Sequence, residues 1–130
     1  MNSNSAVLDA SAILAVIYGE HGAEKLTPEL LANSLVSAVN LAEVHSKLVA
    51  RGWDIVQAWD DSTGVMGQIL PFTTEQARTA GSLVLTTRSL GLSLGDRACL
   101  ALALEHKAPV YTAERSWKNL KLDLRINLIR

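Results

Sequence analysis

Four acidic residues lie far apart in the chain, each beside a segment whose composition predicts burial: Asp9, Glu43, Asp96 and Glu114. A carboxylate beside a buried segment costs free energy unless something pairs with it. Four carboxylates that met in one pocket would repel one another unless a cation held them together. The residue types therefore favour a site for a divalent metal ion.

The histidines and the cysteine show no pattern of metal ligands, which leaves oxygen atoms as the only expected ligands. His21, His45 and His106 stand in separate helical or loop contexts and show no metal-ligand spacing, and the single cysteine, Cys99, lies in an apolar run that predicts a packed, inert thiol. An all-oxygen pocket selects Mg²⁺, with Mn²⁺ as a possible substitute, over zinc. Such ions activate water and neutralise charge on a phosphoryl group, so the natural reaction is phosphodiester hydrolysis.

Three polar residues are expected to support these acids. Ser11 follows Asp9 by two residues, where it would bind a metal-bound water or orient that carboxylate. Asn40 precedes Glu43 by three residues, so the two share a helix face. Thr112 could add a hydroxyl to the same rim.

Each acid also has a purely structural alternative. Asp9 is a good helix N-cap, and Asp96 could be a simple cap after a glycine. Glu43 could pair with Lys47 on a solvated helix face, which is the preferred interpretation for Glu43 taken alone. Glu114 could be a first-turn acid of a short helix. The case for a site depends on whether the four acids converge.

The basic residues Arg97, Arg115 and Lys118 lie close to two of the acids and are candidates for contact with phosphate groups. Arg97 and Arg115 directly follow candidate acids, and Lys118 extends the second basic tract. The chain has 12 Lys and Arg against 13 Asp and Glu, so setting the four candidate acids aside leaves nine acids and a mildly basic remainder. This surface suits a polyanion, although ordinary charge balance explains it equally well.

Short apolar strands alternate with helices along the chain, which predicts a parallel sheet with helices on both faces. In such sheets ligands bind beyond the carboxyl ends of the strands, where all four acids would meet. The expected strands span 6–8, 34–39, 68–72, 110–112 and 126–129, and the expected helices span 11–18, 20–26, 28–32, 40–52 (capped by Asn40), 54–66, 75–87 and 96–107.

Length and composition fit one globular domain over residues 1–130, with 48% hydrophobic and 19% charged residues. A lone cysteine fits a reducing cytosol, so we expect a cytoplasmic protein. The first residues show no basic segment ahead of the apolar stretch, which predicts no secretory signal. No apolar run approaches the ~20 residues that span a bilayer, so no membrane partner is expected.

Four motifs in this chain resemble those of the PIN-domain ribonucleases, and among them the VapC-type toxins of prokaryotic toxin–antitoxin pairs. They occur in the family's order across nearly the whole chain, and the long third motif is the most specific. The motifs are VLDASA at 7–12, SAVNLAEV at 37–44, LSLGDRACLALA at 92–103 and VYTAERSW at 110–117.

The resemblance implies a three-layer α/β/α sandwich around a five-stranded parallel sheet of order 3-2-1-4-5. It implies a Mg²⁺-dependent endoribonuclease that cleaves structured RNA, often transfer RNA or a ribosomal RNA loop. In that interpretation the acids hold the ion, and a bound water attacks the phosphorus and leaves a 5′-phosphate. Family members usually form homodimers and are inhibited by a cognate antitoxin protein.

Carried over by position, Asp9, Glu43 and Asp96 match the three core acids of the family. Glu114 stands where the family usually has Asp, which leaves the geometry of the fourth ligand open. Glu114 is also the one hint of an alternative function, a catalytically weak PIN-fold module that binds RNA or a partner. A fainter alternative is a phosphatase with Asp9 as nucleophile, against which the Ser at position 11 counts.

Overall fold

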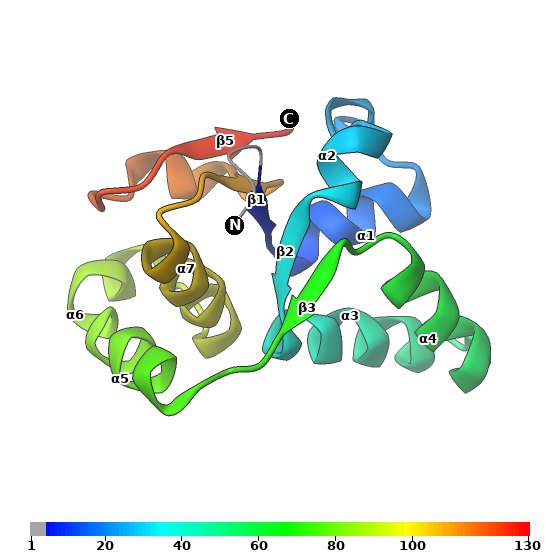
Figure 1. The fold of residues 1–130 in the computed structure, drawn as a ribbon, viewed down its shortest axis with the longest axis horizontal. Helices are drawn as coiled ribbons and strands as arrows, with labels where there is room; N and C mark the ends of the chain where they lie inside the picture. Colours follow the sequence, from blue (N-terminus) through cyan, green and yellow to red (C-terminus); the bar gives the residue numbers. More distant parts are fainter. Residues whose placement is uncertain (1–4) are drawn as a thin grey trace.

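The computed structural model describes residues 5–130 of the chain; residues 1–4, part of the stretch in which we expect no secretory signal, lie outside the described residues. Five short strands form the sheet at the centre of the molecule (Figure 1). They are β1 (Ala6–Leu8), β2 (Ser34–Ser37), β3 (Gln68–Leu70), β4 (Val110–Thr112) and β5 (Ile126–Leu128).

Seven α-helices and three 3₁₀ helices connect these strands in the described part of the chain. The longest two, of 13 residues each, are α3 and α7. The α-helices are α1 (Ala10–Tyr18), α2 (Pro28–Ala32), α3 (Ala38–Ala50), α4 (Ile55–Gly64), α5 (Thr74–Ser82), α6 (Val84–Thr87) and α7 (Leu94–His106), and the 3₁₀ helices are η1 (Ala23–Lys25), η2 (Arg88–Leu90) and η3 (Arg115–Asn119).

All strand pairs are parallel, and the order across the sheet is β3-β2-β1-β4-β5. The expected α/β fold class and strand order 3-2-1-4-5 are therefore confirmed. Val7 of β1 pairs with Leu35 of β2 on one side and with Val110 of β4 on the other. Because all strands run the same way, their carboxyl ends meet at one edge of the sheet, where a ligand site is expected.

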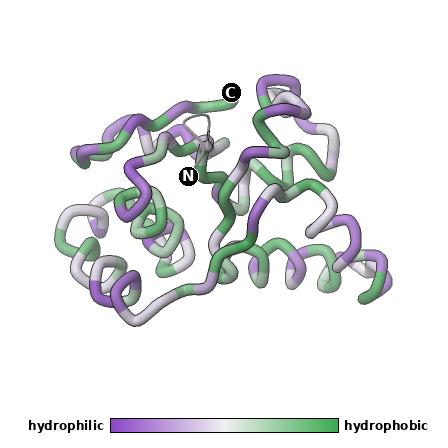
Figure 2. Tube along the Cα trace, viewed as in Figure 1, coloured by the Kyte–Doolittle hydropathy of each residue, from purple (hydrophilic) through white to green (hydrophobic). Residues whose placement is uncertain are grey.

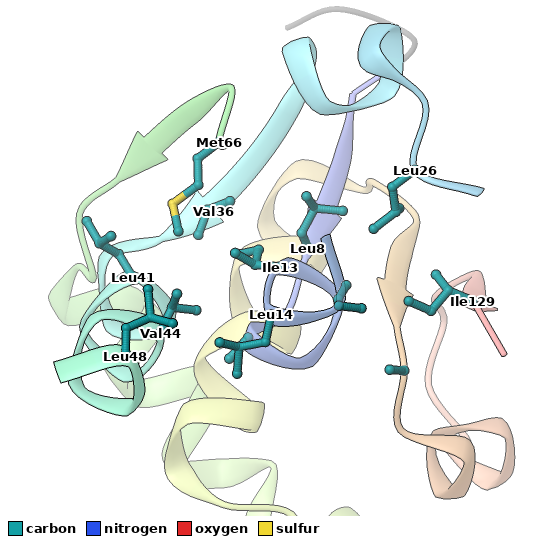
Figure 3. Packing of buried hydrophobic residues seen from close by; sticks show 14 of the residues in the cluster. Leu8, Ile13, Leu14, Leu26, Val36, Leu41, Val44, Leu48, Met66 and Ile129 are labelled. Carbon is teal, nitrogen blue, oxygen red and sulfur yellow. The ribbon is translucent and has the colours of Figure 1, made fainter. Parts of the chain in front are cut away.

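Successive residues of the central strands point to opposite faces of the sheet and enter two separate cores. Leu8 and Val36 face α1, α3 and α4 in the core drawn in Figure 3. Val7 and Leu35 face α7 on the other side. The central strands are buried on both faces, as parallel strands covered by two helical layers must be. The result is the three-layer sandwich that the alternating pattern predicts.

Two helices from opposite layers meet beyond the carboxyl edge of the sheet. Helix α3 leaves β2 and packs on β2 and β3, whereas α7 packs on β1 and β2 from the other face. The two helices also contact each other. Their first turns are joined by a hydrogen bond from Asn40 Nδ2 to the carbonyl oxygen of Gly95, at 3.0 Å. This junction places residues of α3 beside residues of α7.

The start of α3 differs from the sequence prediction. Strand β2 ends at Ser37, two residues earlier than expected, and Ser37 is the N-cap, because its Oγ accepts a hydrogen bond from Val39 N at 3.2 Å. Asn40, expected as the cap, lies inside the helix and is 1% exposed. Ser37 and Asn40 are both suitable N-cap residues. Because Asn40 is buried at the junction of α3 and α7, Ser37 is the residue that caps the helix.

Two other predicted helices are shorter than expected. The segment 75–87 divides into α5 and α6 at Leu83. Here Ser82 Oγ and Thr87 Oγ1 donate to backbone carbonyls four residues back, a contact that competes with regular helix geometry. The segment 20–26 holds only η1, which begins after Gly22, a residue with φ of 97°.

Figure 2 shows hydrophobic residues along β1 and a mixture of hydrophobic and hydrophilic residues along the outer helix α4. On α4, Ile55 and Val56 are 63% and 67% exposed, and Trp59 is also exposed. Large exposed side chains this close together are typical of an interaction surface. Within residues 5–130 no helix has both the length and the apolar character needed to cross a bilayer.

Candidate metal centre

Asp9 is placed by the turn from β1 into α1 and is 2% exposed. Its Oδ1 accepts the backbone N–H of Ala12 at 2.8 Å, so Asp9 caps α1. Its Oδ2 accepts the hydroxyl of Thr112 at 2.6 Å, from the last residue of β4. The cap interpretation is thus right for one carboxylate oxygen, while the other is held by a neighbouring strand.

Two hydroxyl groups join β1 and β4 around this carboxylate. Ser11 Oγ lies 2.8 Å from both oxygens of Asp9 and accepts the backbone N–H of Ala113 at 2.9 Å. Thr112, fully buried, donates to Asp9 and accepts the backbone N–H of Glu114 at 3.0 Å. The hydroxyls of Ser11 and Thr112 therefore hold the Asp9 carboxylate in place through hydrogen bonds.

Glu43 lies at the junction of α3 and α7 and is partly buried. Asn40 Nδ2 donates to its Oε1 at 2.8 Å, one turn earlier on the same helix. Glu43 forms no ion pair with Lys47 or any other basic residue of the part described, which removes the expected alternative of a surface Glu–Lys pair. Its carboxylate instead approaches the backbone of Gly95 on α7.

Asp96 is the third residue of α7 and not its first, because the helix begins at Leu94. The N-cap is Ser93, whose Oγ accepts from Asp96 N at 3.2 Å, while Ser93 N donates to Asp96 Oδ2 at 2.9 Å. This reciprocal pair is a capping box. Asp96 therefore has a structural role at one carboxylate oxygen, as its cap interpretation predicted in part.

Electrostatics tie three of the four acids together. Burial raises the pKa of Asp9 from 3.8 to about 6; hydrogen bonds from Thr112, Ala12 and Ser11 lower it, and the charge of Asp96 raises it. Cys99 is a buried residue of α7, three residues after Asp96. Burial raises the pKa of its thiol well above the usual value, and the charges of Asp9, Asp96 and Glu43 raise it further. The pKa of this one thiol therefore depends on the charges of all three carboxylates.

Glu114 is not brought into this group. It is exposed, follows β4 and touches the cluster through its backbone N–H, which donates to Thr112. Its charge is not among the causes that shift the pKa of Asp9. Nor is it among the charges that raise the pKa of Cys99, which are those of Asp9, Asp96 and Glu43.

The donor set fits a hard divalent cation in chemistry and only partly in arrangement. Buried Asp9 carries a raised pKa, and the oxygens around it come from carboxylates and hydroxyls. Across residues 5–130, however, no three His, Cys, Asp or Glu side chains are arranged to hold one ion together. The carboxylates of Glu43 and Asp96 are each engaged by a local hydrogen bond, to Asn40 and Ser93.

The three basic candidates divide into one structural residue and two exposed ones. Arg97 is partly buried, and its Nη1 donates to the carbonyl oxygen of Ala80 at 2.8 Å, which ties α7 to α5. Arg115 and Lys118 are exposed on η3, which follows β4 and is anchored by buried Trp117. These two cations, and not Arg97, face solvent.

Two residues of the centre were absent from the sequence prediction. Ser93 had a readable signal, because Ser followed three residues later by an acid is the pattern of a capping box. Gly95 had only a weak one, a glycine within an otherwise helical run beside a candidate acid. Its role depends on Glu43, which comes from a distant part of the chain.

A family model described as the PIN domain matches residues 6–122, nearly the whole chain. This chain belongs to the PIN domain family. Among curated proteins, no sequence matches it. The PIN domain assignment agrees with the motifs at 7–12, 37–44, 92–103 and 110–117, all of which fall within the matched region.

Solved structures of similar fold include chains from three bacterial complexes or toxins. They are the DNA-bound VapBC from Salmonella typhimurium (16% identity, 97% of this chain and 98% of that chain covered, TM-score 0.75), VapC20 of Mycobacterium tuberculosis, described as a Sarcin-Ricin loop cleaving toxin (18%, 92% and 98%, 0.72), and VapBC2 of Rickettsia felis bound to a promoter DNA fragment (19%, 94% and 96%, 0.70). At these identities the likeness shows a shared PIN fold.

Proposed function

We propose that residues 1–130 form a single PIN domain that acts as a Mg²⁺-dependent endoribonuclease, the toxin of a cytoplasmic toxin–antitoxin pair. The observation that carries this proposal is the buried carboxylate of Asp9, at the carboxyl edge of the sheet, whose pKa the charge of Asp96 also raises. The charges of Asp9, Asp96 and Glu43 all raise the pKa of Cys99. Asp9 has a like charge nearby and no ion pair with a basic residue among residues 5–130, a setting in which a buried acid favours a cation.

Asp9, Glu43 and Asp96 would hold Mg²⁺, for which Mn²⁺ is the expected substitute, and Glu114 would join as a fourth ligand if its side chain turned inward. A bound ion of this kind supplies charge neutralisation and lowers the pKa of water. Ser11 and Thr112 keep the Asp9 carboxylate oriented through hydrogen bonds of 2.8 and 2.6 Å. Asn40 Nδ2 orients Glu43, and the backbone N–H of Ser93 orients Asp96.

The substrate class is proposed from the solved structures of similar fold and from the charge of the surface. VapC20 is described as cleaving the Sarcin-Ricin loop, which is a structured RNA, and we extend that class to this chain. Arg115 and Lys118 are exposed on η3, directly after β4, and are proposed to contact RNA phosphates. Arg97 is proposed to act indirectly, since it holds α7 against α5.

The partner is proposed to be an antitoxin protein. Two of the similar structures are described as VapBC assemblies. In this chain α4 exposes Ile55, Val56 and Trp59, and a groove of about 340 Å³ lies between α1 and α4. Asp60 and Asp61 line that groove, so this surface suits a protein and repels RNA. Homodimer formation is part of the proposal.

The test is cleavage of total transfer RNA and ribosomal RNA by purified, antitoxin-free protein, with Mg²⁺ and with chelator. We expect discrete products that disappear with chelator and in Asp96→Asn, whose amide keeps an oxygen that can accept from Ser93 N. Asp96→Asn protein that cleaves at the wild-type rate would reject the proposed site.

A second candidate function is a PIN-fold module that binds RNA or a partner and cleaves weakly. The exposed position of Glu114 favours it, because this acid stands apart from the other three. Folded wild-type protein that yields no product with Mg²⁺ or Mn²⁺ would favour the module. In that case Glu114→Asp is the substitution to examine for recovered cleavage.

A further inference from the structure

The carboxylate of Glu43 is enclosed by groups from two helices. On α3, Asn40 Nδ2 donates to Glu43 Oε1 at 2.8 Å. On α7, the backbone of Gly95 lies against the same carboxylate, so that a Cβ added to Gly95 would overlap its carbon and both of its oxygens. The position of this acid is therefore set by Asn40 and Gly95 together.

The side chain of Asn40 suits this place because an amide nitrogen carries two N–H groups. One points to Glu43 Oε1 and the other to the carbonyl oxygen of Gly95, at 3.0 Å. Both partners only accept hydrogen bonds, which fixes the orientation of the amide. An Asp here would offer no N–H and would add a like charge, and a Ser could donate only once.

Gly95 contributes the space that the carboxylate occupies. Its φ is not positive, so its backbone conformation does not require glycine. Inside a helix, alanine is favoured over glycine by about 1 kcal/mol. Glycine at this buried position is explained by the approach of Glu43, because the three atoms nearest to an added Cβ all belong to that side chain.

We propose that Asn40 and Gly95 form a socket that positions Glu43 against the first turn of α7 and thereby beside Asp96, the residue after Gly95. Neither residue is catalytic; both act through Glu43. The proposal rests on the proposed function in one respect, that Glu43 and Asp96 serve the same metal ion. The junction of α3 and α7 is then the element that sets the spacing of two metal-binding acids.

The first test fills the socket. Gly95→Ala should displace the flexible Glu43 side chain and weaken Mn²⁺ binding about tenfold, a typical effect for a residue that orients a ligand. Binding is measured by the loss of the free Mn²⁺ signal in electron paramagnetic resonance. The midpoint of thermal unfolding should not fall by a comparable degree, because helical Gly→Ala is favourable in itself.

The second test removes the donor. Asn40→Ala should weaken Mn²⁺ binding about tenfold, and Asn40→Asp should do so while keeping the size of the side chain. Lys47→Ala is the matched control, an exposed residue one turn beyond Glu43 on the same helix, and should leave Mn²⁺ affinity unchanged. RNA cleavage by the Asn40 variants at saturating Mn²⁺ should recover toward the wild-type kcat.

Repeating both substitutions in a Glu43→Ala protein decides whether they act through Glu43. In that background Gly95→Ala and Asn40→Ala should leave Mn²⁺ affinity unchanged, and Gly95→Ala should raise the thermal midpoint because nothing then occupies its space. Equal weakening in both backgrounds would overturn the socket.

The outcomes distinguish a failure of this proposal from a failure of the proposed nuclease function. Wild-type protein that binds Mn²⁺ but cuts no RNA would overturn the nuclease and leave the socket to be decided by the Mn²⁺ titrations. Wild-type protein that cuts RNA, with additive effects of Asn40 and Glu43 on Mn²⁺ affinity, would overturn the socket alone. Wild-type protein that binds no Mn²⁺ would overturn both.

Discussion

Asp9 loses its proton at a higher pH than an exposed aspartate does, because burial raises its pKa from 3.8 to about 6. Between about pH 4 and about pH 6 the folded chain holds a proton that the unfolded chain has released. The contribution of Asp9 to stability therefore falls as the pH rises through this window and is fully lost above it. The size of the effect is roughly 3 kcal/mol.

We expect this loss in urea unfolding of metal-free protein at a series of pH values. The free energy of unfolding of the wild type should decrease relative to that of Asp9→Asn as the pH rises, because the amide does not titrate. Addition of Mg²⁺ at pH 7 should raise the stability of the wild type and not of the variant. A constant difference between the two proteins across the range would contradict a raised pKa for Asp9.

The hydroxyl of Thr112 donates a hydrogen bond of 2.6 Å to Asp9, shorter than those from Ser11 and Ala12 at 2.8 Å. Thr112→Val keeps the shape and removes the donor, which leaves a buried carboxylate with one partner fewer, and should lower the free energy of unfolding by about 1–3 kcal/mol at pH 7. Thr112→Ser keeps the hydroxyl and is the matched control. Equal stability of the Val and Ser variants in urea unfolding would show that this hydrogen bond contributes nothing measurable.

At the scale of elements, the first turn of α7 combines a helix cap with a candidate ligand. Ser93→Ala removes the side chain that accepts from Asp96 N and should lower the free energy of unfolding by about 1 kcal/mol. RNA cleavage per folded molecule should remain, because the Asp96 carboxylate is still present. Asp96→Asn should give the opposite pattern, a small change in stability and a loss of cleavage.

The comparison of these two variants uses denaturant unfolding and initial cleavage rates at a temperature where both are folded. If Ser93→Ala abolishes cleavage as fully as Asp96→Asn, the cap itself is needed to orient the carboxylate. The separate roles assigned here to the two sides of the capping box would then be wrong.

The elements themselves were largely predictable from the sequence. Strands 6–8 and 110–112 have the bounds that the sequence predicts, because short apolar runs bounded by polar residues and Pro109 leave little choice. The strand order came from the resemblance to the PIN family, since apolar runs alone do not tell which strands are neighbours. The predicted start of α3 was wrong because Ser37 and Asn40 are both suitable caps, and tertiary burial of Asn40 decides between them.

The candidate site was predictable only in part. Asp9 and Asp96 were predicted from their places beside strand and helix ends. The structure adds that Asp9 caps α1 and that Asp96 belongs to the capping box of α7, whose N-cap is Ser93. The exposed position of Glu114 could not be predicted from the sequence, because it depends on how the chain turns from β4 into η3. Likewise, the link from Arg97 to Ala80 joins two helices whose packing no local pattern records.

At the scale of the whole molecule, charge is unevenly distributed. The charges of Asp9, Glu43 and Asp96 all act on Cys99, while Arg115 and Lys118 are exposed just beyond β4. Removing both cations by Arg115→Gln with Lys118→Gln should raise KM for RNA without lowering kcat. The dependence of binding on salt should also weaken, by about 0.7 in the log–log slope for each phosphate that the variant no longer neutralises.

Lys107→Gln is the control for this variant. Lys107 follows the last residue of α7, a helix about 20 Å long whose first turn holds Asp96. Because Lys107 lies at the opposite end of this helix, its charge should not contact the same RNA segment. Filter binding at several salt concentrations measures both slopes. A slope that changes as much with Lys107→Gln as with the double substitution would show that RNA binds by overall charge and not at η3.

With the metal binding proposed above, the burial of Asp9 would also link the persistence of the chain to the supply of divalent cations. At neutral pH, without such an ion, a charged carboxylate sits where water does not reach it, and the folded state is correspondingly less favoured. An ion that binds only the folded chain shifts that balance by mass action. Proteases that degrade transiently opened molecules would therefore clear the ion-free form sooner, so that cation depletion would remove the protein itself as well as its activity.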